Sequence, residues 1–269
     1  MEIRDFAAFF KLRLAFLVVV SAVLGYFMGA DSSDATTLIS LIVGGFLVTG
    51  ASNGLNQVIE RNLDVKMKRT AGRPLPLGKM TVVKGVLLAG ISGMIGVAIL
   101  WFGCNPFSAF LGMFAMFSYA ALYTPLKQIS PIAVFVGAFP GAIPPMLGYV
   151  AATGQFDVYA GVLFAVQFIW QFPHFWAIAW VLDDDYKAGG FRLLPSKGGR
   201  DKASAFQALI YAIFLLPVSL LPWYLGMTGA WSVVLIVAIG LLFVFMAYRL
   251  YYACSIVAAR QLMFASFIN

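Results

Sequence analysis

The stretch Thr37-Leu-Ile-Ser-Leu-Ile-Val-Gly-Gly-Phe-Leu-Val-Thr-Gly-Ala-Ser-Asn-Gly-Leu55 contains no charged residue. A helix needs about 20 apolar residues to cross a bilayer, so this run is long enough to span a membrane. It is followed at once by Asn56-Gln-Val-Ile-Glu60-Arg-Asn-Leu-Asp64, which carries amides and acids. The junction therefore predicts a membrane helix whose end presents polar side chains at the membrane surface.

Seven further charge-free runs have a similar length. Over the whole chain, 62% of the 269 residues are hydrophobic, 11% are charged and the mean hydropathy is +0.91. These values exclude a soluble domain and a disordered chain. The sequence predicts an all-α, polytopic transmembrane bundle with these eight spans: Leu14–Ala30, Thr37–Leu55, Gly85–Phe102, Phe107–Tyr123, Ile132–Ala152, Val158–Leu182, Ala203–Gly226 and Ala230–Tyr248.

The charged residues divide between the two sides of this bundle. When the loops are taken alternately, all 18 Lys and Arg residues fall on the side of the N-terminus. The other side carries Asp31, Asp34 and Asp157. By the positive-inside rule the N-terminus is cytoplasmic, in the cell (inner) membrane. The net charge of +7 is therefore a topology signal and does not indicate nucleic-acid binding.

A further largely apolar segment follows the eighth span. Residues Ala258–Ile268 read as the first turns of a ninth span, and we prefer a truncated span to a short interfacial helix. We expect residues 1–269 to form a single transmembrane domain with two pseudo-repeated four-helix halves, eight complete spans and a partial ninth.

Two long loops on the cytoplasmic side contain the candidate metal-binding and phosphate-binding residues. In the first, Asn56, Glu60 and Asp64 are four residues apart and would share one helix face. Their oxygens suit Mg²⁺. Arg69 and Arg73 follow, and guanidinium groups bind phosphate in a bidentate manner. The ordinary alternative is a solvated helix end with ion pairs.

The second loop begins with Asp183, Asp184 and Asp185, four spans after the first cluster. Equivalent positions in two halves suggest that the clusters face each other and hold a diphosphate through Mg²⁺ from two sides. The ordinary alternative is a capped, solvated turn. After span four, Tyr123 and Lys127 add a phenol and an ammonium, four residues apart, that could contact the same diphosphate.

Together these motifs resemble the intramembrane UbiA-type prenyltransferase superfamily, and within it the heme O synthases (protoheme IX farnesyltransferases). The resemblance extends from about Lys11 to Phe267, and three stretches carry it. The first is Asp64-x₂-Met-x-Arg-Thr-x₂-Arg-Pro-Leu75, and the second is Tyr123-Thr-Pro-Leu-Lys127 with Gly141-Ala-Ile-Pro-Pro-Met-Leu-Gly148. The third is Pro173-His-Phe-Trp176 with Asp184-Asp-Tyr186 and Leu194-Pro195. Glu60 stands where this family usually has Asp, which leaves the ligand oxygens in place. The family has nine spans, so the short ninth is the larger departure.

The resemblance implies the reaction and its substrates. Farnesyl diphosphate and heme B would give heme O and diphosphate in a water-poor pocket that both substrates enter from the membrane lipid. Asn56, Glu60 and Asp64 would hold one Mg²⁺, and Asp184 and Asp185 the other. Arg69, Arg73, Tyr123 and Lys127 would contact diphosphate oxygens. A heme A synthase or an oxidase-assembly protein would be the partner that receives the product.

His174 is the one histidine of the chain and lies inside span six. An ionisable residue inside a membrane suggests a functional role. It could ligate heme iron, or it could be a neutral histidine bonded to a carbonyl that Pro173 frees. The resemblance favours heme contact by His174 together with Trp176.

Two rival functions remain. A prenyltransferase that acts on an aromatic quinone precursor would share the acidic clusters and differ at Pro173–Trp176. A membrane transporter would carry its ionisable groups near the middle of the bilayer, whereas here the acids lie at the cytoplasmic ends of the spans.

Overall fold

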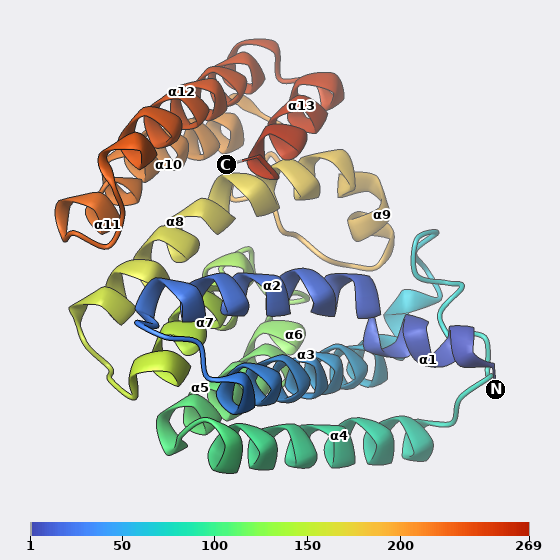
Figure 1. Cartoon of the computed structure of the whole chain (residues 1–269). Coiled ribbons are helices and arrows are strands. Elements are labelled where there is room, and N and C mark those ends of the chain that lie inside the picture. The colour runs from blue at the N-terminus through green and yellow to red at the C-terminus, as the bar shows by residue number, and fades with distance from the viewer. Residues whose placement is uncertain (1, 269) are drawn as a thin grey trace.

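The computed structural model describes residues 2–268, and all its regular elements in that range are helices (Figure 1). In chain order they are α1 (Ile3–Phe10), α2 (Leu12–Gly29), α3 (Ala35–Asp64), α4 (Val82–Gly103), α5 (Pro106–Phe117), the π-helix η1 (Ser118–Tyr123), α6 (Thr124–Leu126), α7 (Ala133–Thr153), α8 (Val158–Val181), α9 (Asp183–Ala188), α10 (Lys202–Ser219), α11 (Leu221–Tyr224), α12 (Ala230–Ala253) and α13 (Ile256–Ser266). Segments α5, η1 and α6 follow one another without a break and form one span.

The eight predicted spans are confirmed. Among the described residues, eight helices are long and apolar enough to cross a membrane. Their outer surfaces expose large apolar side chains such as Phe102, Trp231 and Tyr252, each at least 80% exposed. Such a surface is stable only against lipid. The chain is therefore a multi-pass membrane protein, and the segment after the eighth span forms the short helix α13, which packs against α8 and α12.

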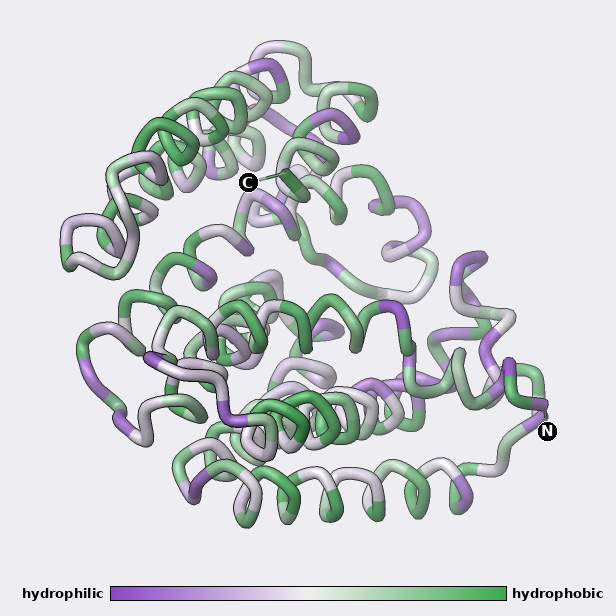
Figure 2. The backbone as a smooth tube through the Cα atoms, in the orientation of Figure 1, coloured by the Kyte–Doolittle hydropathy of each residue, from purple (hydrophilic) through white to green (hydrophobic). Residues whose placement is uncertain are grey.

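Helix α3 is longer than the apolar run that predicts it. The predicted run ends at Leu55, but the helix continues without a break to Asp64. Asn56, Glu60 and Asp64 consequently lie on one face of a rigid helix, as their spacing indicates. Figure 2 shows that hydrophilic segments gather beyond this end of α3, in the loop between α3 and α4 and around α9.

Two of the three acids on the opposite side of the membrane, Asp34 and Asp157, have a structural role. Asp34 accepts hydrogen bonds from the backbone N–H groups of Thr36 and Thr37 and caps the start of α3. Asp157 caps the start of α8 in the same way. Each carboxylate satisfies N–H groups that lack a partner within the helix and interacts favourably with the positive end of the helix dipole.

Close packing between α2 and α7 brings the two halves of the bundle together. A Cβ atom at Gly25 would overlap the carbonyl oxygen of Pro145, and one at Gly148 would overlap that of Ala22. Helices in lipid associate through such small residues, because apolar side chains gain little by leaving lipid for protein. The glycines therefore fix the distance between α2 and α7, and both helices line the same cavity.

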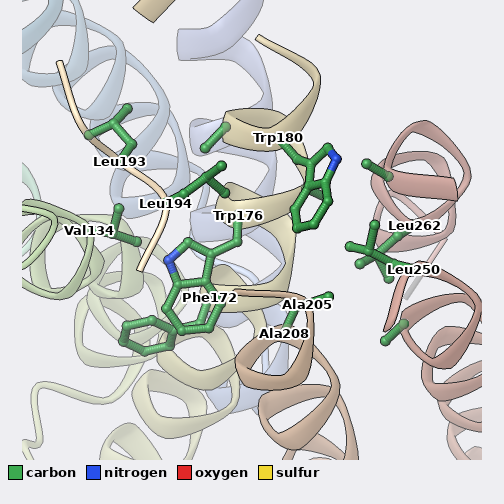
Figure 3. Packing of buried hydrophobic residues seen from close by; sticks show 14 of the residues in the cluster. Val134, Phe172, Trp176, Trp180, Leu193, Leu194, Ala205, Ala208, Leu250 and Leu262 are labelled. Carbon is green, nitrogen blue, oxygen red and sulfur yellow. The ribbon is translucent and has the colours of Figure 1, made fainter. Parts of the chain in front are cut away.

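The second half is organised around α8. Figure 3 shows Trp176 beside Val134, Leu193 and Leu194, and it shows Trp180 on the side of α8 that faces Leu250 and Leu262. Both tryptophans are at most 6% exposed. Helix α8 therefore contacts α7 on one side and α10 and α13 on the other, and α12 packs behind α10 and α13.

We predict that Gly148→Ala lowers the stability of the bundle by about 1–3 kcal/mol, because the new methyl group must separate α2 from α7. Thermal unfolding of the purified protein in detergent measures the change. Gly90→Ala in α4 is the matched control, because a Cβ atom there meets nothing within 4 Å. It should leave stability unchanged or raise it by up to about 1 kcal/mol. Equal losses in the two variants would contradict the interpretation.

Candidate active site

The polar row of α3 is buried, and a basic side chain contacts each member. Asn56, Glu60 and Asp64 are at most 3% exposed. Lys127 forms an ion pair with Glu60. Arg73 Nη1 lies 2.8 Å from Oδ1 and 2.7 Å from Oδ2 of Asp64. A buried carboxylate needs a compensating charge, and both carboxylates of the row have one.

The third contact comes from Lys11, whose Nζ donates to Asn56 Oδ1 at 3.2 Å. Lys11 joins α1 to α2 with φ of 47°, a left-handed conformation that is uncommon for a residue other than glycine. Two buried amides of α3 hold this elbow. Gln57 Nε2 donates to the carbonyl oxygens of Ala8 and Phe9 at 2.9 and 2.7 Å, and Asn53 Nδ2 donates to that of Phe10 at 3.2 Å.

Lys11 is a site residue that the sequence reasoning missed, because it was counted there only as a topology signal. The available signal is the pair Asn53 and Gln57, two amides adjacent to the acid row on the same helix. Amides buried on α3 must find carbonyl partners, and the nearest end of a neighbouring segment supplies them.

The π-helical segment η1 brings Tyr119, Tyr123 and Lys127 to the same place. Thr124 Oγ1 donates to the carbonyl oxygen of Tyr119 at 2.8 Å and accepts from Asn56 Nδ2 at 3.2 Å. Lys127 Nζ lies 4.8 Å from the centre of the Tyr123 ring, within the range of a cation–π contact. The predicted pair of Tyr123 and Lys127 therefore lies against the acid row, and π-helical insertions of this kind are common at functional sites.

The electrostatic environment is dominated by cations. Burial lowers the pKa of Lys11 to about 7, and the nearby charges of Arg73 and Lys127 lower it as well. Burial also lowers the pKa of Lys127, and Glu60 opposes that shift. Positive charges crowded against one another in this way are stabilised by an anion.

The second acidic segment lies beside the loop between α3 and α4. Asp185 Oδ1 accepts from the backbone N–H of Lys68 at 2.7 Å, which links α9 to that loop. Its Oδ2 is buried and has no hydrogen-bond partner among the described residues. The Asp184 side chain is 80% exposed and pairs with Arg200 at 3.0 Å, so the two predicted ligands have different surroundings.

Asp183 and Tyr186, the other residues of this segment with polar side chains near the site, each contact a basic residue. Asp183 is buried and pairs with Lys187 at 2.7 Å. The Arg69 guanidinium lies 5.6 Å from the centre of the Tyr186 ring. Burial raises the pKa of Tyr186, so its phenol stays protonated and can donate a hydrogen bond.

The arrangement differs from a preformed metal cage. Within residues 2–268, no group of three or more His, Cys, Asp or Glu side chains is close enough to hold a metal ion. Mg²⁺ characteristically keeps water and substrate-phosphate ligands and takes one or two carboxylates from the protein. The oxygens of Asn56, Glu60 and Asp64, and separately the unpartnered Oδ2 of Asp185, fit cations of that kind.

An apolar cavity of about 350 Å³ extends from this polar end into the bundle. Aromatic side chains lie near its polar end, including Tyr119, Tyr123 and Tyr186. Gln171, Phe175 and Ile178 line it from α8, on one face of the helix. Farther from the acid row its walls are aliphatic, and its deepest part includes Leu41, Leu100 and Leu147.

His174 and Trp176 do not line this cavity. His174 Nδ1 lies 2.7 Å from Ser266 Oγ in α13, and its ring stacks on Trp170 with centres 4.5 Å apart. Trp176 is packed in the core against Phe172 and Tyr211. At 100° per residue, His174 is about 60° around α8 from the cavity-lining Gln171, which places it at the edge of the cavity face.

Comparison with known proteins identifies the family. Residues 18–268 match the UbiA prenyltransferase family. The chain is 49% identical over 267 residues to the protoheme IX farnesyltransferase of Christiangramia forsetii, with 97% of this chain and 88% of the relative covered. It is 46% identical to the protein of the same name from Cytophaga hutchinsonii, with 98% and 94% covered.

Solved structures share the fold at low sequence identity. A digeranylgeranylglyceryl phosphate synthase superposes with a TM-score of 0.82 at 19% identity, covering 98% of this chain and 93% of that one. A UbiA homolog from Archaeoglobus fulgidus bound to GPP and Mg²⁺ gives 0.73 at 11% identity, with 98% of each chain covered. With the family match over residues 18–268 and relatives of 49% and 46% identity, this chain belongs to the UbiA prenyltransferase family.

Proposed function

We propose that this chain transfers the farnesyl group of farnesyl diphosphate to a vinyl group of heme B, giving heme O and diphosphate. The names of the relatives support the choice of substrates. The observation that carries the proposal is the buried acid row, neutralised by basic side chains and adjacent to one end of an apolar cavity. A charged head group and a long apolar chain would fit such a site together.

The basic side chains would bind the diphosphate by exchanging partners. Arg73 and Lys127 are held by Asp64 and Glu60, and Lys11 is held by Asn56. If the acid row turns to a divalent cation, these basic groups become available to phosphate oxygens at the same place. Arg69, beside Tyr186, would contact the diphosphate from the α9 side.

We assign Asn56, Glu60 and Asp64 to one Mg²⁺ and the α9 carboxylates to a second. Bound Mg²⁺ would neutralise the charge that develops on the departing diphosphate. Among the α9 residues we favour Asp185 over Asp184, because Asp185 Oδ2 is buried without a partner whereas Asp184 is exposed and paired with Arg200. The metal would arrive with the diphosphate.

The cavity would protect the reactive carbon centre. The bond between C1 and the diphosphate oxygen breaks, and the allylic cation is delocalised. The rings of Tyr119, Tyr123 and Phe175 line the cavity and can stabilise a cation through their π faces. The vinyl group then forms a bond to C1, and water adds to the carbon next to the porphyrin and gives up a proton to the released diphosphate.

His174 would contact the heme iron through Nε2. Ser266 Oγ donates to the carbonyl oxygen of Met263 at 2.6 Å, so it accepts from His174 Nδ1–H. That assignment leaves Nε2 with a free lone pair, the form in which histidine binds iron. Trp176 would act through packing of α8 and would shape the heme side without touching it.

We further propose that the acid row faces the cytoplasm in a cell (inner) membrane. Support comes from the positive residues, which gather on the side of the acid row. The partner that receives heme O would approach this protein within the membrane.

Membranes that contain the chain should convert farnesyl diphosphate and heme B into heme O in the presence of Mg²⁺, as detected by mass spectrometry. Removal of Mg²⁺ with EDTA should abolish the product, and Asp64→Ala should do the same. The test against the quinone-type rival is 4-hydroxybenzoate as acceptor. Product from 4-hydroxybenzoate and none from heme B would overturn the proposal, and unchanged turnover in Asp64→Ala would remove the metal assignment.

The two α9 carboxylates should respond differently to the same substitution. Asp185→Asn should lower kcat by about 100-fold or more, because it removes the carboxylate that we assign to the second Mg²⁺ and whose Oδ2 is buried without a partner. Asp184→Asn is the matched control and should stay within about fivefold of the parent chain, because an exposed ion pair contributes little. A larger loss in Asp184→Asn than in Asp185→Asn would reverse the assignment.

Heme binding to purified protein should depend on the His174 ring. Ferric heme should give the Soret band of a histidine-ligated iron with the parent chain, and His174→Ala should lose this band. Added imidazole should restore it in the variant. Trp170→Phe keeps an aromatic ring against His174 and should retain the band. Identical spectra for the parent chain and His174→Ala would show that another group contacts the iron.

A further inference from the structure

At the side opposite to the acid row, the cavity is lined by buried apolar side chains. On α3 it is lined from Asn53 at one end to Leu41 at the other. Leu41 is 15 residues from Asn56, which is about 22 Å at a rise of ~1.5 Å per residue. Leu41 and Leu100 are fully buried, and with Leu147 they belong to one core cluster that continues through Tyr26 and Val150.

Leu100 is clamped at this end by glycines of two other helices. A Cβ atom at Gly44 in α3 would lie 2.8 Å from Leu100 Cγ, and one at Gly112 in α5 would lie 2.8 Å from Leu100 Cδ1. Leu100 is also the cavity-lining residue that α4 supplies. The two glycines therefore make room for one leucine side chain, which closes the space between α3, α4 and α5.

We propose that Leu100, held by Gly44 and Gly112, is the main determinant of the length of the prenyl chain that the cavity accepts. This inference rests on the proposed function, because it takes the diphosphate to lie at the acid row. A chain that starts there must run toward Leu41 and Leu100. An additional isoprene unit must then displace side chains that are already closely packed. The limit is steric, since the walls at this depth are aliphatic and offer no polar group that recognises one chain over another.

The experiment compares three donors, geranyl, farnesyl and geranylgeranyl diphosphate, with Mg²⁺ present. Leu100→Ala should raise the affinity and the kcat/KM for geranylgeranyl diphosphate relative to farnesyl diphosphate by roughly tenfold, the size of effect that a few methylene groups have in an apolar pocket. Affinity is measured on purified protein by calorimetry, without heme. Donor selection can thus be measured even if heme B proves to be the wrong acceptor.

Two further variants keep the test decisive. Leu111→Ala is the matched control, because Leu111 is buried in the same cluster but does not line the cavity, so its donor preference should not change. Gly45→Val adds side-chain volume inside the cavity one turn from Leu41, where the nearest atom to a Cβ is Val19 Cγ2 at 3.4 Å. It should shift preference toward geranyl diphosphate by roughly tenfold.

Three outcomes would overturn the proposal. The first is an unchanged ratio of affinities for the long and short donors in a folded Leu100→Ala. The second, if that variant does not fold, is an unchanged ratio in Gly45→Val. The third is an equal change in Leu111→Ala and Leu100→Ala, which would mean that loosening of the bundle, and not the end of the cavity, alters selection. By contrast, farnesyl diphosphate binding with the predicted shifts but no reaction with heme B would retain this inference and reject the proposed acceptor.

Discussion

The burial of two carboxylates at the end of a membrane helix is the constraint on which the rest of the site depends. Glu60 and Asp64 are almost inaccessible, and a buried charge without a partner costs several kcal/mol. Their cations come from different parts of the chain. Arg73 follows in the loop after α3, and Lys127 follows the π-helical end of the α5 span. The loops must fold over the acid row to deliver these charges, so the row positions the loops and the loops complete the site.

The positions of the helices follow from a second constraint, the close approach of backbones. Gly25 and Gly148 let α2 touch α7, and Gly44 and Gly96 let α3 touch α4. These contacts leave a space between α2, α3, α5, α7 and α8 that side chains do not fill. The bundle tolerates this cavity because its packing energy is gained at the α2–α7 and α3–α4 contacts that border it. A long apolar chain can occupy the cavity without moving these helices.

The sequence predicts the helices well and the site in part, for different physical reasons. Apolar runs and the one-sided distribution of Lys and Arg are properties of the chain itself, so the eight spans follow from them. Spacing places Asn56, Glu60 and Asp64 on one face, because a helix imposes a fixed angle per residue. The contact of Lys11 with Asn56 joins residues 45 positions apart, and it depends on the α1–α2 elbow. No local pattern contains that information.

The α9 acids illustrate a further limit. Asp184 and Asp185 are adjacent and chemically identical in the sequence, so spacing cannot distinguish them. In the fold, successive residues of a short helix point in different directions, one toward Arg200 and water and the other toward Lys68 and the protein interior. His174 is similar, since its position at the edge of the cavity face depends on how α8 is rotated against α13.

The balance of charge at the site explains why a metal–diphosphate complex suits it better than either ion alone. The basic side chains Lys11, Arg69, Arg73 and Lys127 lie close to the carboxylates Glu60, Asp64 and Asp185. A prenyl diphosphate carries up to three negative charges, and the two proposed Mg²⁺ ions carry four positive charges. Free Mg²⁺ would be repelled by the basic side chains, and a free diphosphate would be repelled by the carboxylates. In the complex the carboxylates contact the metal ions and the basic side chains contact the phosphate oxygens, and at low dielectric these opposite charges favour joint binding.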